Sequence, residues 1–113
     1  MKKFEEKTIQ SELKFKGRII TLQVDEVELP NGKTSNREIV KHPGAVAVIA
    51  VTKDKKIILV EQFRKALERS IIEIPAGKIE IGEAPEITAL RELEEETGYT
   101  TDNLQYIQSF STS

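Results

Sequence analysis

The chain has 113 residues, with 17 Lys and Arg against 19 Asp and Glu, one His and no Cys. This length suits one compact domain, the absence of Cys excludes disulfides and thiol chemistry, and the near-neutral charge argues against a nonspecific nucleic-acid binder. No apolar run reaches the ~20 residues of a membrane-spanning helix, and no apolar leader begins the chain. We therefore expect a cytoplasmic protein with neither nucleic acid nor membrane as a partner.

The first region, residues 7–40, predicts short antiparallel strands. Its apolar alternation runs to Val24 and resumes at Val27 one residue out of phase, which indicates a bulge or bend near residues 25–26. A Pro-Asn-Gly turn signal at residues 30–32 predicts a tight hairpin between two of the strands.

After residue 42 the pattern changes. Residues 45–51 are apolar at every position and rich in Val and Ile, which predicts a strand buried on both faces. Further strands are predicted at residues 56–62, 71–74 and 104–110. A helix is predicted at residues 85–97, because Pro is tolerated in a first turn and Gly98 supplies a C-terminal stop. This mixture of strands and a helix indicates an α/β protein.

The predicted helix carries crowded carboxylates. At about 100° per residue, Glu92, Glu95 and Glu96 fall within one sector of about 100°. Like charges at this spacing destabilise a helix, and the negative end of the helix dipole disfavours them further. The alternative is a solvated acidic face, or a docking surface for a basic partner. Violation of several local preferences is nevertheless typical of a functional site, and clustered carboxylates suit Mg²⁺ or Mn²⁺.

A fixed spacing joins this helix to the residues before it. Five residues separate Gly77 from Glu83, and seven more lead to Arg91-Glu92-Leu93-Glu94-Glu95-Glu96-Thr97-Gly98-Tyr99. The pattern resembles the Nudix box over its whole length, although Tyr99 stands where the family prefers an aliphatic residue. The resemblance implies the Nudix α/β/α sandwich, a mixed sheet with the box helix, preceded here by a small antiparallel N-terminal sheet. It also implies hydrolysis of a nucleoside diphosphate linked to another group.

The same resemblance assigns roles to individual residues. It implies a catalytic site for Mg²⁺ or Mn²⁺ whose ligands are Glu92, Glu95, Glu96 and the backbone carbonyl of Ala76. It implies structural roles within the motif for Gly77, Glu83, Arg91 and Gly98. In these roles Glu83 braces the start of the helix, and Arg91 pairs with the glutamates.

Further segments resemble the ADP-ribose pyrophosphatase branch of the family, in particular its Bacillus-type members. They are the strand-rich N-terminal region, Val60-Glu61-Gln62-Phe63-Arg64 and Glu73-Ile74-Pro75-Ala76-Gly77. The branch implies that Arg64 contacts the substrate diphosphate and that Arg37 and Glu38 meet the adenine end. Alternatively, Arg64 is a surface arginine.

The implied reaction converts ADP-ribose to AMP and ribose 5-phosphate. Alternatives are hydrolysis of NADH, a dinucleoside polyphosphate or a nucleotide sugar, or a non-catalytic Nudix-like nucleotide-binding module. We expect residues 1–42 to form a β-strand region that makes a homodimer. Residues 43–113 are expected to be a Nudix hydrolase domain that is incomplete at its C-terminal end, since the relatives continue further and carry their general base there.

Overall fold

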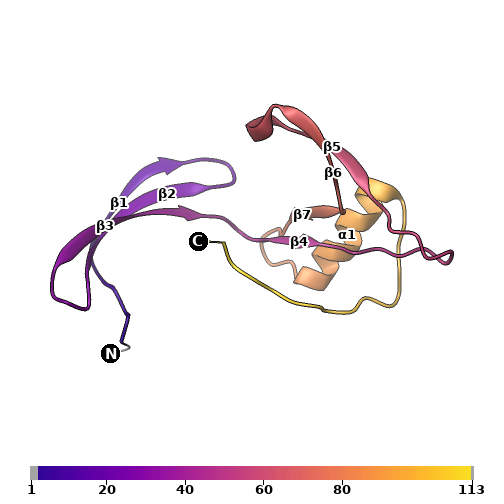
Figure 1. The fold of residues 1–113 in the computed structure, drawn as a ribbon. Coiled ribbons are helices and arrows are strands. Elements are labelled where there is room, and N and C mark those ends of the chain that lie inside the picture. Colours follow the sequence, from indigo (N-terminus) through magenta and orange to yellow (C-terminus); the bar gives the residue numbers. More distant parts are fainter. Residues whose placement is uncertain (1–2, 113) are drawn as a thin grey trace. The chain divides into compact units, whose positions relative to one another are not determined.

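The computed structural model describes residues 3–112, which fold as two compact units that divide between Pro43 and Gly44 (Figure 1). Within the described residues, no helix combines the length and the apolar composition that crossing a membrane requires. The strand pairs in both units are antiparallel.

The first unit is a three-stranded sheet with the order β1-β2-β3 (Figure 1). Its strands are β1 (Lys7–Lys16), β2 (Thr21–Glu28) and β3 (Thr34–Lys41). The turn between β2 and β3 is closed by a hydrogen bond from the Gly32 N–H to the Leu29 carbonyl (2.9 Å), and Gly32 adopts φ 84°. This φ lies in the left-handed region that glycine enters at low cost. The antiparallel strands and the hairpin predicted for this region are therefore confirmed.

The irregularity expected near residues 25–26 is present in the sheet but lies in β1 rather than in β2. β2 pairs with β3 residue for residue, whereas the register of β1 shifts between Thr8 and Gln10, opposite Val27 and Glu26. In the continuous strand β2, Val24 lies on one face, whereas Asp25 and Val27 are buried on the other, and this accounts for the phase slip in the sequence. Asp25 is tolerated there since its Oδ1 accepts hydrogen bonds from Ser11 Oγ (2.7 Å) and Gln23 Nε2 (2.9 Å).

The second unit contains two strand pairs and a helix (Figure 1). β4 (Ala45–Ala47) pairs with β7 (Ala76–Lys78), and β5 (Val60–Arg64) pairs with β6 (Arg69–Glu73) as a hairpin closed by the 3₁₀ helix η1 (Lys65–Leu67). The helix α1 (Pro85–Thr97) follows β7 and packs against β4 and β7. The helix predicted at residues 85–97 is confirmed.

The core of the second unit lies between α1 and the segment that begins with β4. Val48, Ala89 and Leu93 are buried, and Val46 and Ala50 pack against them. The regular strand stops at Ala47, short of the predicted end at residue 51, although Val48 N–H still donates to the Pro75 carbonyl (2.8 Å).

Burial of this segment on both faces was expected, and for the described residues that expectation is wrong. Val46, Val48 and Ala50 point toward the core, whereas Ile49 and Val51 are 56% and 61% exposed. The strand predicted at residues 104–110 is also wrong. These residues have no regular secondary structure and are exposed, because no strand among residues 3–112 pairs with them through backbone hydrogen bonds.

Candidate active site

One carboxylate anchors the start of α1. The residue before the helix, Ala84, makes no side-chain capping bond. Glu83 instead accepts a hydrogen bond from the Oγ1 of fully buried Thr88 (2.6 Å) and two from Arg91, through Nε and Nη2 (2.9 Å each). The bonds from Arg91 and, to a lesser extent, from Thr88 lower the pKa of Glu83 to about 2. Glu83 is therefore an ionised anchor between the preceding loop and the helix.

Arg91 also reaches two of the crowded glutamates. Its Nη1 donates to Glu92 Oε1 (2.9 Å) and to Glu95 Oε2 (3.3 Å), while its Nη2 donates to the Lys78 carbonyl (3.3 Å). The hydrogen bonds to Glu83 are the main reason why the pKa of Arg91 is raised. This single cation offsets part of the repulsion that the sequence predicts along the helix.

The helix presents two carboxylates to the backbone of β7. The Ala76 N–H donates to Glu96 Oε2 (3.3 Å). At the next residue, a Cβ added to Gly77 would overlap the Cγ, Cδ and Oε1 of Glu92. Glu92 and Glu96 are four residues apart and share one helix face, so both carboxylates lie against adjacent residues of one strand. The φ of Gly77 lies outside the left-handed region, so the backbone conformation does not itself require glycine. Glycine is required because Glu92 occupies the space of a Cβ.

Glu95, the third expected ligand, differs from these two. Its side chain is 58% exposed, and one of its oxygens pairs with Arg91. Within residues 3–112 no group of three or more acidic, His or Cys side chains has the arrangement of a metal site. Two carboxylates and the backbone of Ala76 nevertheless lie together beside β7, and carboxylate and carbonyl oxygens are the ligands that Mg²⁺ and Mn²⁺ prefer. The chemical types of these residues therefore suit a hard divalent cation.

Arg64, the predicted diphosphate ligand, lies at the end of β5. Its Nε donates to Glu73 Oε1 at the end of β6 (2.7 Å), and this bond is the largest cause of its raised pKa. The charge of Glu96 makes a smaller contribution that also raises the pKa of Arg64. No role of its own was predicted for Glu73 from the sequence. The alternation of side chains along paired strands is the signal that places Glu73 on the same hairpin face as Arg64.

Arg37 and Glu38 lie in the first unit, on β3. Consecutive strand residues point to opposite faces, and Arg37 lies opposite Asp25 while Glu38 lies opposite Val24. Arg37 donates from Nε and Nη2 to the two carboxylate oxygens of Glu6 (2.8 Å each). This bidentate pair lowers the pKa of Glu6 and raises the pKa of Arg37. The structure therefore does not bring Arg37 and Glu38 together.

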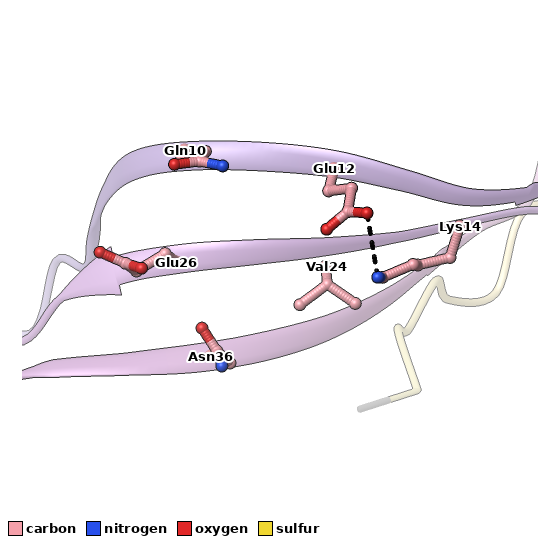
Figure 2. Close-up of a pocket in the computed structure, with 6 residues that line it drawn as sticks. All are labelled: Gln10, Glu12, Lys14, Val24, Glu26 and Asn36. Atoms are coloured by element: carbon pink, nitrogen blue, oxygen red, sulfur yellow. Dashed lines mark ion pairs between the residues drawn. The ribbon is translucent and has the colours of Figure 1, made fainter.

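A shallow depression of about 290 Å³ lies on the sheet face that carries Glu38. Figure 2 shows the side chains that line it, Gln10, Glu12, Lys14, Val24, Glu26 and Asn36. Glu12 and Lys14, two residues apart on β1, form an ion pair at this face (3.0 Å). None of the predicted site residues lines this depression, and it belongs to the first unit rather than to the box helix.

Comparison with known proteins supplies independent information. Two family models match the chain, the NUDIX domain at residues 41–113 and the nucleoside diphosphate sugar hydrolase N-terminal domain at residues 6–40. The ADP-ribose pyrophosphatase of Bacillus subtilis is 68% identical over 113 residues, which cover 100% of this chain and 61% of that protein. The methanol dehydrogenase activator of Bacillus methanolicus is 66% identical over 112 residues, covering 99% of this chain and 60% of that protein.

The chain thus spans about three fifths of the length of both curated relatives. A crystal structure of an ADP compounds hydrolase matches with a TM-score of 0.85 at 24% identity, covering 100% of this chain and 62% of that one. This likeness confirms the fold that the box residues predicted. Within residues 3–112, α1 is the one α-helical layer on the strands.

Proposed function

Because the chain belongs to the Nudix family, we propose that its protein hydrolyses the diphosphate of ADP-ribose to AMP and ribose 5-phosphate. The observation that carries the proposal is the apposition of Glu92 and Glu96 to the backbone of Gly77 and Ala76. The substrate is supported by the relative that is 68% identical and named an ADP-ribose pyrophosphatase.

In this proposal the reaction depends on Mg²⁺ or Mn²⁺. Glu92, Glu96 and the Ala76 carbonyl would hold the cation, with Glu95 as a further ligand. Such a cation, when bound, neutralises phosphate oxygens and lowers the pKa of a coordinated water. The glutamates of α1 would otherwise repel an anionic diphosphate.

The remaining residues bind and orient. Arg64 binds the diphosphate, because one guanidinium can donate hydrogen bonds to two phosphate oxygens at once. Glu83 and Arg91 hold the glutamates against β7. Arg37 and Glu38 serve the adenine end, and their positions on opposite faces of β3 allow each to be tested separately. The region 1–42 is proposed to dimerise and residues 43–113 to form the hydrolase domain, in the cytoplasm as the sequence predicts.

A second candidate function is activation of a dehydrogenase. It is favoured by the 66% identity to a protein named methanol dehydrogenase activator. The two functions are compatible, since hydrolysis of a nucleotide could itself be the activating step. A catalytically inactive variant that still activated a dehydrogenase would separate them.

The direct test is hydrolysis with Mg²⁺, using ADP-ribose, NADH and diadenosine polyphosphates in separate reactions with product identification. We expect ADP-ribose to be preferred and to yield AMP. Glu92→Gln and Glu96→Gln should each lower turnover by at least ~10²-fold. Circular dichroism should show an intact helix, because Gln matches Glu in helix propensity. Glu94→Gln is the matched control, since Glu94 is exposed on the same helix.

Three outcomes would contradict the proposal. A clear preference for NADH or a diadenosine polyphosphate would overturn the substrate. Binding of ADP-ribose without turnover would favour a non-catalytic module. Near-normal activity of Glu92→Gln or Glu96→Gln would remove that residue from the metal site.

A further inference from the structure

The ion pair between Arg64 and Glu73 runs along the length of the β5–β6 hairpin. The two residues point to the same face of the β5–β6 hairpin, but Arg64 pairs with Arg69 at the closed end and Glu73 pairs with Val60 at the open end. Four residue steps along a strand correspond to about 13 Å. The side chain of Arg64 must therefore extend along the hairpin, away from η1 and toward the end that leads into β7, to place its Nε 2.7 Å from Glu73.

Glu73 is itself held in a fixed position relative to the candidate metal site. Two residues later comes Pro75, which is fully buried and accepts a hydrogen bond from the Val48 N–H (2.8 Å). The next residue, Ala76, donates its N–H to Glu96. The short segment from Glu73 to Ala76 thus links two carboxylates. Glu73 accepts the bond from Arg64, and Ala76 donates to Glu96, which is an expected metal ligand.

The geometry of the pair differs from that of the structural pair on α1. Arg91 donates from both Nε and Nη2 to the two oxygens of Glu83, so one carboxylate occupies both of these nitrogens. Arg64 uses Nε alone on Glu73, and the bond does not involve Nη1 or Nη2. The terminal nitrogens are the groups that can bind two oxygens of an anion.

We propose that Glu73 is a positioning residue, which holds the Arg64 guanidinium extended along the hairpin with both terminal nitrogens directed at the substrate diphosphate. This inference rests on the proposed function, in which Arg64 binds that diphosphate. The advantage is preorganisation, because an arginine already extended in one direction loses less side-chain entropy when the substrate binds.

The pair can be tested without any substrate. The Arg64 Nε–H should give a protected signal in ¹H–¹⁵N spectra, assigned by its disappearance in Arg64→Lys. Glu73→Ala should abolish that protection. Glu61→Ala is the matched control, because Glu61 lies on the opposite face of the same hairpin and is exposed. An unchanged Arg64 signal in Glu73→Ala would overturn the proposal whatever the substrate is.

Kinetics then test whether Glu73 acts through Arg64. We expect Glu73→Ala to raise the KM for ADP-ribose by about 3- to 30-fold, and Glu73→Gln to raise it less, since Gln keeps an acceptor oxygen. In an Arg64→Ala background, Glu73→Ala should add less than a twofold change. Equal effects in both backgrounds would show that Glu73 has a general structural role and would refute the inference.

Failure of the proposed function is a separate result. If the unmutated protein does not hydrolyse ADP-ribose, the substrate assignment is wrong, and the dissociation constant for inorganic pyrophosphate replaces KM in the same set of variants. Weaker pyrophosphate binding in Glu73→Ala only when Arg64 is present would support positioning. Identical binding in all variants would overturn it.

Discussion

Gly77→Ala offers a test in which activity and stability separate. The added Cβ would overlap the Cγ, Cδ and Oε1 of Glu92, so the Glu92 side chain must rotate away from β7. The backbone itself accepts Ala, because Gly77 does not adopt a positive φ. The predicted damage is therefore confined to the position of one expected metal ligand and to the hydrogen bond that it accepts from Arg91.

The expected stability change is small. Replacing Gly by Ala at a compatible backbone position stabilises a protein by about 0.4–1 kcal/mol through the unfolded state. Forcing a side chain off its rotamer costs about 0.5–1.5 kcal/mol. These contributions oppose each other, and their difference, of about 1 kcal/mol at most, shifts Tm by no more than about 4–8 °C. Misplacement of a catalytic group by about 1 Å can cost 10²-fold in rate, so we expect kcat to fall by about that factor.

The assay combines thermal unfolding with steady-state hydrolysis of ADP-ribose in four proteins: unmutated, Gly77→Ala, Glu92→Ala and the double variant. Once Glu92 is truncated, the added methyl group at Gly77 has nothing to overlap. The double variant should therefore be no less active than Glu92→Ala, which is the non-additivity expected of residues that act on one site. Full activity of Gly77→Ala, or an equal further loss in the Glu92→Ala background, would refute the reasoning.

Two further predictions concern the arginines and their partners. Arg64→Ala should raise the KM for ADP-ribose by about 10- to 100-fold, and Arg64→Lys should raise it by less. Unchanged kinetics in Arg64→Ala would show that Arg64 is only a surface charge. Glu83→Gln should lower Tm at pH 7, and exposed Glu86→Gln serves as its control. Because the pKa of Glu83 falls from 4.5 to about 2 on folding, its stabilisation is present above pH 4.5 and is lost as the pH falls toward 2. The Tm difference between Glu83→Gln and the unmutated protein should shrink over that range, and a constant difference would contradict the assigned ion pair.

The elements with strong local signals could be predicted from the sequence. Pro85 and Gly98 mark both ends of α1, and the structure places the helix between them. The turn signal at residues 30–32 likewise produced the expected hairpin. Such signals act within a few residues, so they depend little on the rest of the chain.

Features set by distant contacts could not be predicted. Asp25 looks like an interruption in an apolar alternation, yet it is buried because Ser11, 14 residues away, donates to it. Residues 104–110 have the composition of a strand, but in the described part of the chain no strand pairs with them. In the same way, the contact between Glu73 and Arg64 depends on the pairing of β5 with β6, which places both side chains on one face of the hairpin.

The box helix combines local instability with tertiary support. α1 ends without a basic residue in its last turn and carries glutamates at its negative pole, where local preferences favour Lys or Arg. Its stability must therefore come from elsewhere: buried Ala89 and Leu93 pack on Val48, and Arg91 connects Glu83 with the crowded carboxylates. Most helical stability in proteins does arise from such packing rather than from propensity. Because this support is supplied by the opposite face and by one internal cation, Glu92 and Glu96 can remain directed at β7, where a cation could neutralise both.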